Sequence, residues 1–181
     1  MGVLATVSEA GSGDTLYGVL LFLHIVCAIV GFGAVVLNGL YGAEAKKRPG
    51  PGGLAVSQAN LAVTEIGQYF IYAVFVLGIL LVLTAEDNTF DFADSWVWLS
   101  IVLYVAAIGF SHARQLPNAK RMIALAEELN SAGPPPEGAQ GPPPQVAEMD
   151  AIGKQLAMGG AILNLALLAI IYLMIFKPGW P

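Results

Sequence analysis

The chain has 181 residues, of which 56% are hydrophobic and only 12% are charged, and its net charge is −5. Soluble domains carry about 25% charged residues, so this composition excludes an ordinary soluble domain and indicates a protein that lies in a lipid bilayer. The sequence has no basic stripe, which excludes nucleic acid as a partner. Its single cysteine, Cys27, excludes an intrachain disulfide and a cysteine-based metal framework.

Four apolar segments are each long enough to cross the hydrocarbon layer, which requires about 20 residues. They predict transmembrane helices at about 16–42, 57–84, 95–113 and 146–176. We therefore predict an all-α polytopic membrane protein, in which a four-transmembrane-helix bundle forms a single membrane domain over 1–181.

The longest predicted loop, between the third and fourth helices, has two parts. In 114–130, Met122, Leu125 and Leu129 recur at helical spacing, which predicts a cytoplasmic amphipathic helix near the inner membrane surface. The stretch 131–145 contains two proline triplets and is expected to form a linker without regular structure.

The positions of lysine and arginine predict the orientation of the bundle. Seven of the eight basic residues lie on one side of the bundle: six between the first and second helices or between the third and fourth, and Lys154 at the inner end of the fourth. Because basic loops stay in the cytoplasm, both termini are expected outside. Trp96, Trp98 and Trp180 fall at the outer boundary, where tryptophan is enriched.

The first predicted helix carries one ionisable side chain, His24, in the stretch "LFLHIVCAIVGFGAVVLNG". Cys27, Gly31 and Asn38 follow it on one stripe, which is expected to face the bundle. The helical rise of about 1.5 Å per residue places Tyr104 at nearly the same depth as His24. Three roles are open for His24: a hydrogen bond to Tyr104 or to a backbone carbonyl, a haem or other cofactor ligand, or the handling of protons or substrate.

Other polar residues are predicted to gather at the inner edge of the membrane. Glu65, Gln68, Tyr69 and Tyr72 share one face of the second helix, and Glu65 is expected to pair with Arg114 or a lysine. The predicted polar cluster consists of Asn38, Tyr41, Glu65, Gln68 and His112. Asn164 of the fourth helix is added to it, at a depth of about 12 Å from the inner side of the membrane. One histidine and one carboxylate make a weak metal site, so no metal site is predicted there.

The two histidines are predicted at opposite ends of the bundle. Their rings would be separated by well over about 10 Å along the membrane normal, which disfavours a haem held by both. A five-coordinate haem on His24 and a haem shared across a two-fold dimer both remain open. For helix packing, the small residues Gly31, Gly153, Ala157 and Ala161 are predicted to let helices approach closely.

The segment "LHIVCAIVGFGA", with Leu23-His24 followed by glycines, resembles a family of uncharacterised bacterial integral membrane proteins with four helices. The Leu-His pair is also similar to the first helix of copper-resistance D-type proteins and of the membrane protoporphyrinogen oxidase that carries haem b. The first resemblance implies a multi-pass protein of the bacterial cytoplasmic membrane. The second implies His24 as a candidate ligand of haem b or a metal.

No catalytic motif such as GxSxG, HExxH, a P-loop or GxGxxG occurs in the sequence, so no catalytic residue is predicted. The first functional hypothesis is a non-catalytic accessory or assembly subunit of a larger membrane complex, for example a respiratory one, or a small homo-oligomer. Its partners would be the lipid bilayer and either other membrane subunits or a second copy of the chain. The alternatives are a haem- or metal-binding redox protein that uses His24 and a small transporter built on the inner polar cluster.

The predicted orientation can be tested with single cysteines introduced into a Cys27→Ala background. A membrane-impermeant maleimide added to intact cells should label Ser95→Cys and should leave Gly50→Cys unlabelled until the membrane is permeabilised. Labelling of Gly50→Cys alone in intact cells would reverse the orientation.

Overall fold

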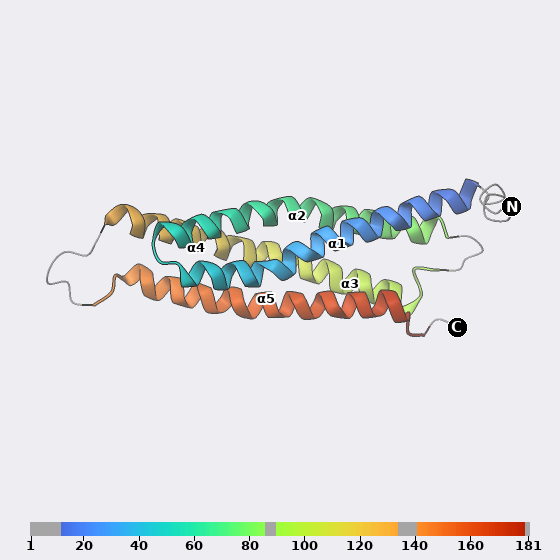
Figure 1. Ribbon diagram of the computed structural model, residues 1–181. Coiled ribbons are helices and arrows are strands. Elements are labelled where there is room, and N and C mark those ends of the chain that lie inside the picture. The colour runs from blue at the N-terminus through green and yellow to red at the C-terminus, as the bar shows by residue number, and fades with distance from the viewer. Residues whose placement is uncertain (1–11, 86–89, 134–140, 180–181) are drawn as a thin grey trace.

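The computed structural model describes residues 12–85, 90–133 and 141–179, and within these ranges all regular structure is helical. The helices are α1 (Ser12–Lys47), α2 (Pro51–Leu83), α3 (Ser95–Phe110), the π-helical η2 (Ser111–Gln115), α4 (Leu116–Ala132) and α5 (Pro144–Phe176). Four long helical rods run side by side, and α1 begins at the same end of the bundle where α5 ends (Figure 1).

All four rods are long and apolar enough to cross a membrane, which confirms the predicted fold class. Their lengths are 33 residues for Thr15–Lys47, Pro51–Leu83 and Pro144–Phe176 and 38 residues for Ser95–Ala132. At 1.5 Å per residue each rod is about 50 Å long or more, whereas the hydrocarbon layer is about 30 Å thick. A substantial part of each rod therefore lies beyond the hydrocarbon layer.

The outward faces of the rods are apolar. Phe22, Ile29 and Leu165 are exposed by 65%, 69% and 67% of their surface, and many other large hydrophobic side chains are exposed as well. A soluble monomer rarely exposes contiguous apolar surface on this scale. These faces are suited to contact with lipid.

The helices α1 and α2 form the closest pair in the bundle. A Cβ atom on Gly31 would lie 2.9 Å from Ile71 Cγ1 and 3.1 Å from the Ile71 backbone nitrogen. A Cβ atom on Gly67 would lie 2.7 Å from the Ala34 Cβ. Small residues thus bring the two backbones together, as they commonly do between membrane helices.

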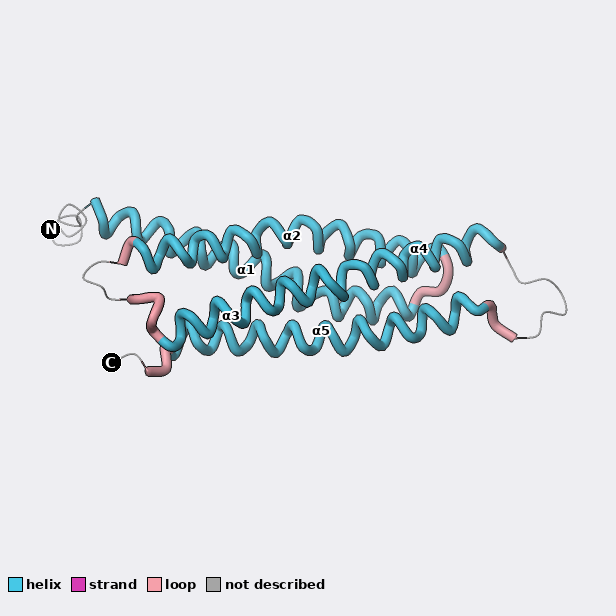
Figure 2. The backbone as a smooth tube through the Cα atoms, turned by 180° about the vertical axis from the view of Figure 1, so that it is seen from behind, coloured by secondary structure: helices cyan, strands magenta, loops and turns pink. Residues whose placement is uncertain are grey.

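The other side of the bundle is built around α5, which packs against α3, α4 and α1. The view from behind shows α3 and α5 lying along each other (Figure 2). The backbones of α2 and α3 stay further apart, and aromatic side chains bridge the space between them. The rings of Phe75 and Tyr104 stack there with their centroids 5.0 Å apart.

The end of the bundle that carries the chain termini is closed by a cluster on α3 and α5. Trp96, Val97 and Leu173 are buried together. The Ser95 hydroxyl donates to the Pro178 carbonyl at 2.7 Å, and Lys177 Nζ lies 4.1 Å from the centroid of the Phe90 ring. These contacts tie the start of α3 to the end of α5.

The segment predicted as a surface-lying amphipathic helix has a different orientation in the structure. It forms α4, which continues α3 through η2 without a break and packs against α5 and α2. Leu125 on α4 is completely buried, because its apolar face finds neighbouring helices rather than lipid. Within the predicted linker 131–145, residues 134–140 lie outside the described ranges, and α5 already begins at Pro144.

The end of the bundle opposite the termini, which we call the basic end, carries Lys46, Lys47 and Arg48. Hydrogen bonds and ion pairs between polar side chains connect its helices. Between α4 and α5, Arg121 donates to both carboxylate oxygens of Glu148 at 2.8 and 3.1 Å, and Asn118 donates to Gln155 at 3.0 Å. Between α2 and α4, Gln58 donates to Glu127 at 2.8 Å, and Lys120 lies 3.5 Å from Glu65.

The glycine contact between α1 and α2 predicts opposite effects for the same substitution at two positions. Gly31→Ala should destabilise the protein by about 1–3 kcal/mol, because the new methyl group overlaps Ile71. Gly33→Ala should be neutral or stabilising by up to about 1 kcal/mol, because nothing lies within 4 Å and alanine favours helix. Thermal unfolding in detergent measures both, and equal stabilities would contradict the proposed close contact.

Candidate functional site

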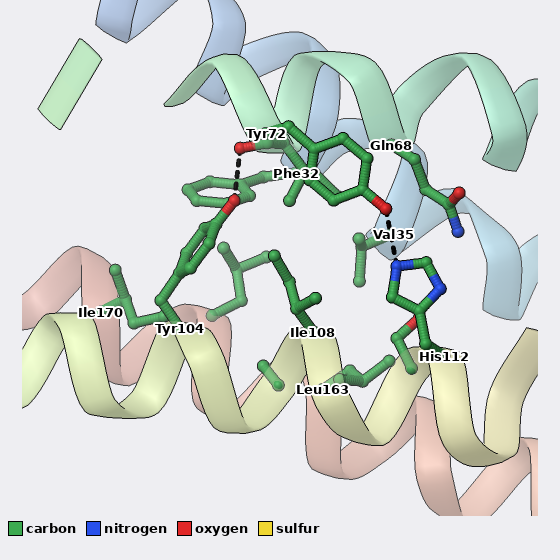
Figure 3. A pocket seen from close by; sticks show the side chains of 13 residues that line it. Phe32, Val35, Gln68, Tyr72, Tyr104, Ile108, His112, Leu163 and Ile170 are labelled. Carbon is green, nitrogen blue, oxygen red and sulfur yellow. Dashed lines mark hydrogen bonds between the residues drawn. The ribbon is translucent and has the colours of Figure 1, made fainter. Parts of the chain in front are cut away.

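A cavity of about 70 Å³ lies between the two sides of the bundle (Figure 3). Phe32 and Val35 of α1, Gln68, Ile71 and Tyr72 of α2, and residues of α3, η2 and α5 line it. It exists because α2 and α3 are held apart while their aromatic side chains reach across the space. Most of its wall is apolar, and its polar groups lie at a few positions.

The principal polar contact of the cavity joins Tyr72 of α2 to His112 of η2. The Tyr72 hydroxyl oxygen lies 2.6 Å from His112 Nε2, and the two rings are stacked with an interplanar angle of 25°. Both side chains are exposed at the edge of the cavity. The π-helical turn that carries His112 is of a kind found frequently at functional sites.

Two other polar side chains of the cavity differ in how they are satisfied. Tyr104, which is buried, donates its hydroxyl hydrogen to the backbone carbonyl of Ile71. Gln68 precedes Tyr72 by one helical turn, so its side chain lies on the same face of α2. Within the described part of the chain, the Gln68 amide has no hydrogen-bond partner.

His24 lies at the contact between α1 and α2 and outside this cavity. A Cβ atom on Gly78 would lie 3.2 Å from His24 Cε1, so the ring is packed directly on that glycine. Its polar contact is with the backbone of Val74, and its Nδ1 atom is buried without a hydrogen-bond partner among the described residues. The structure does not bring His24 to Tyr104, because the Tyr104 hydroxyl is directed to Ile71.

The surroundings of His24 do not fit a haem. The Nδ1 atom is buried between α1 and α2, and the ring lies against Gly78 and contacts the backbone of Val74. An axial ligand needs a nitrogen directed at a metal about 2 Å away, with room for the macrocycle beyond it. In the described ranges, no three histidine, cysteine or acidic side chains gather in a group that could hold a metal ion.

The structure distributes the predicted inner polar cluster over several separate contacts. Asn38 accepts a hydrogen bond from Thr64 at 2.8 Å, and Glu65 pairs with Lys120 at 3.5 Å. Gln68 and His112 come together at the cavity. Tyr41 is 36% exposed, and Asn164 donates to the Gly160 carbonyl of its own helix at 3.0 Å.

The residues predicted for helix packing also differ in their positions. Gly31 is buried at the contact of α1 with α2, and Gly153 faces Met122 Cε, which lies 3.6 Å from the position of an added Cβ. Ala157 and Ala161 are exposed. The closest approach on α5 occurs instead at Gly159, where a Cβ atom would overlap the Gln115 side chain.

Tyr72 is predicted to share one face of the second helix with Gln68, but the predicted polar cluster does not include it. Its spacing of four residues from Gln68 indicates that both side chains lie on the same side of α2. Its pairing with His112 depends on the π turn, for which the sequence gives no comparable signal.

Comparison with known families shows which family the chain matches. A family described as "Predicted integral membrane protein (DUF2269)" matches residues 18–178, which cover three of the four membrane-crossing segments completely and all but the first three residues of Thr15–Lys47. No curated protein and no solved structure matches the chain.

The packing of His24 leads to a spectroscopic prediction. Protein purified in mild detergent from haem-supplemented cells should show no Soret band that depends on His24, because its Nδ1 atom is buried and the ring is packed on Gly78. A visible absorption spectrum measures this. A Soret band that disappears in His24→Ala and persists in His112→Ala would show that His24 does bind haem.

Proposed function

Since the chain belongs to the DUF2269 family of predicted integral membrane proteins, we propose that it acts as a non-catalytic accessory or assembly subunit of a larger membrane complex. The observation that supports this proposal is the length of the four helices, which gives each of them an extension beyond the thickness of the hydrocarbon layer. Such an extension offers a helical surface outside the lipid on which a second protein can dock.

The length of the extension follows from the helix lengths. Rods of 33 to 38 residues exceed the thickness of the hydrocarbon layer by about 20 to 27 Å. The Trp96 cluster, at the start of α3, is expected at the outer membrane boundary, because tryptophan is enriched there. Most of the excess length therefore falls at the basic end. We place this end in the cytoplasm of a bacterial cell, because basic segments stay on that side of the membrane.

The polar contacts of α4 with α5 and α2 give this extension a defined shape. The ion pair of Arg121 with Glu148 and the hydrogen bond from Gln58 to Glu127 are both exposed to solvent, so they are weak sources of stability. They do fix α4 relative to α5 and α2. A surface that is ordered before binding loses less conformational entropy when a partner docks.

The alternatives receive less support from the geometry. The His24 ring is packed on Gly78 with its Nδ1 atom buried, which argues against a haem-based redox protein. The polar residues proposed for a transport site are divided among separate contacts, and Asn38 and Glu65 each have their own partner. Binding to another protein is the function that the extension at the basic end supports best.

The accessory role can be tested by native mass spectrometry of the full chain extracted from its own membrane in mild detergent. We expect a stoichiometric complex with a second, different membrane protein. A stand-alone monomer, or a complex that contains only copies of this chain, would contradict the proposal.

Exchanging the charges of an ion pair tests whether the extension at the basic end is the docking surface. Arg121→Glu and Glu148→Arg should each lower the yield of the complex several-fold, because each places like charges side by side between α4 and α5. The double variant restores an ion pair and should recover the yield. Equal yields for the wild type and both single variants, with normal helix content, would show that a different surface binds the partner.

A further inference from the structure

The cavity between α2, α3 and α5 has no part in the accessory role, and its chemistry points to a ligand. Its polar side chains are Gln68, Tyr72, Tyr104, Ser111 and His112. Among the described residues that line it, none is an aspartate, glutamate, lysine or arginine. A charged ligand would therefore be buried without a counter-ion, which is strongly unfavourable. The ligand of such a cavity is uncharged.

The hydrogen-bonding groups of the cavity are concentrated on one side of it. The Tyr72 hydroxyl and His112 Nε2 are 2.6 Å apart, and Gln68 lies one helical turn before Tyr72. A hydroxyl can donate one hydrogen bond and accept two, so the Tyr72–His112 contact leaves capacity for a further partner. The Gln68 amide, which has no partner within the described ranges, adds donors and an acceptor. Together these groups are suited to bind a carbonyl or hydroxyl oxygen.

The walls of the cavity favour a flat ring. Phe32, Tyr72 and Tyr104 come from three different helices and point toward the same space (Figure 3). Aromatic side chains pack well against other rings in offset or edge-to-face arrangements. Ligand sites of this kind combine apolar and aromatic walls with a few polar groups that fix orientation.

The position of the polar groups indicates how a ligand reaches them. Tyr72 is 39% exposed, and His112 is exposed as well, so the pair lies at the open edge of the cavity between α2 and α3. This edge faces the bilayer, and a lipid-soluble molecule can enter there. The enclosed space of about 70 Å³ is roughly half that of a cavity that holds benzene, about 150 Å³. Only one edge of a ring enters it, and the rest of the ligand stays in the lipid.

We propose that this cavity binds an uncharged lipophile with an oxygen-bearing ring, that is, a quinone or an alkylphenol. The Tyr72 hydroxyl and the Gln68 amide bind the ring oxygen. The π-helical turn η2 positions His112 beside Tyr72, where His112 Nε2 donates its hydrogen to the Tyr72 oxygen and leaves the Tyr72 hydroxyl hydrogen for the ligand. The ring edge lies against Phe32 and the alkyl tail extends into the bilayer between α2 and α3. This site is independent of the docking surface at the basic end.

The experiment uses the full chain in lipid nanodiscs and a decyl-substituted benzoquinone as the probe, with binding measured by isothermal titration calorimetry. We expect saturable binding of one probe per chain. Tyr72→Phe keeps the ring and removes only the hydroxyl, so it should weaken binding by about threefold to tenfold, as expected for one hydrogen bond. His112→Ala should weaken it to a similar extent, and Ala107→Leu, which fills the cavity, should weaken it further.

Tyr172→Phe is the matched control, because Tyr172 is an exposed tyrosine on α5 that does not line the cavity. It should bind the probe like the wild type, and thermal unfolding should show that each variant is folded. Decylphenol should displace the quinone, whereas decanol, which has the same tail without a ring, should not. Absence of saturable binding, equal affinity in Tyr72→Phe and wild type, or displacement by decanol as strong as by decylphenol would each overturn the proposal.

Discussion

The close contact between α1 and α2 is the constraint on which the rest of the bundle depends. Gly31 and Gly67 lack a Cβ, so each helix lies directly against Ile71 or Ala34 of the other. Lipid provides no hydrophobic driving force between helices, and such close van der Waals contact takes its place. The turn before α2 contains Gly50 at φ 68°, a conformation that glycine adopts without strain. The two helices consequently behave as one unit against which the others are arranged.

The face of α2 that is turned toward α3 is packed less tightly than the face turned toward α1. There the backbone of α3 remains at a distance, and Tyr72, Phe75 and Tyr104 fill the space with rings instead of small residues. Rings pack less completely than interlocked aliphatic chains when they must also satisfy hydroxyl groups. The cavity is the volume that results. The tight packing on one face of α2 and the loose aromatic packing on the other therefore both follow from the close contact of α2 with α1.

The sequence predicts the parts of this structure that depend on one helix at a time. Hydrophobic length is a property of a single segment, so the four membrane-crossing helices and the all-helical class follow from it directly. Contacts between helices depend on rotation and depth, which single segments do not determine. His24 therefore meets Gly78 instead of Tyr104, and Tyr72 meets His112. Gly159 contacts Gln115 although the neighbouring Ala157 and Ala161 fit the small-residue pattern better.

The π-helical turn η2 has a geometric consequence for everything that follows it. A π turn holds one residue more than an α turn, so it rotates the continuing helix by about 100° relative to an uninterrupted α-helix. With that rotation, Leu125 is buried among the neighbouring helices and Arg121 reaches Glu148. Without it, the same residues of α4 would be turned away from these neighbours. One extra residue within Ser111–Gln115 thus determines which side of α4 faces the neighbouring helices at the basic end.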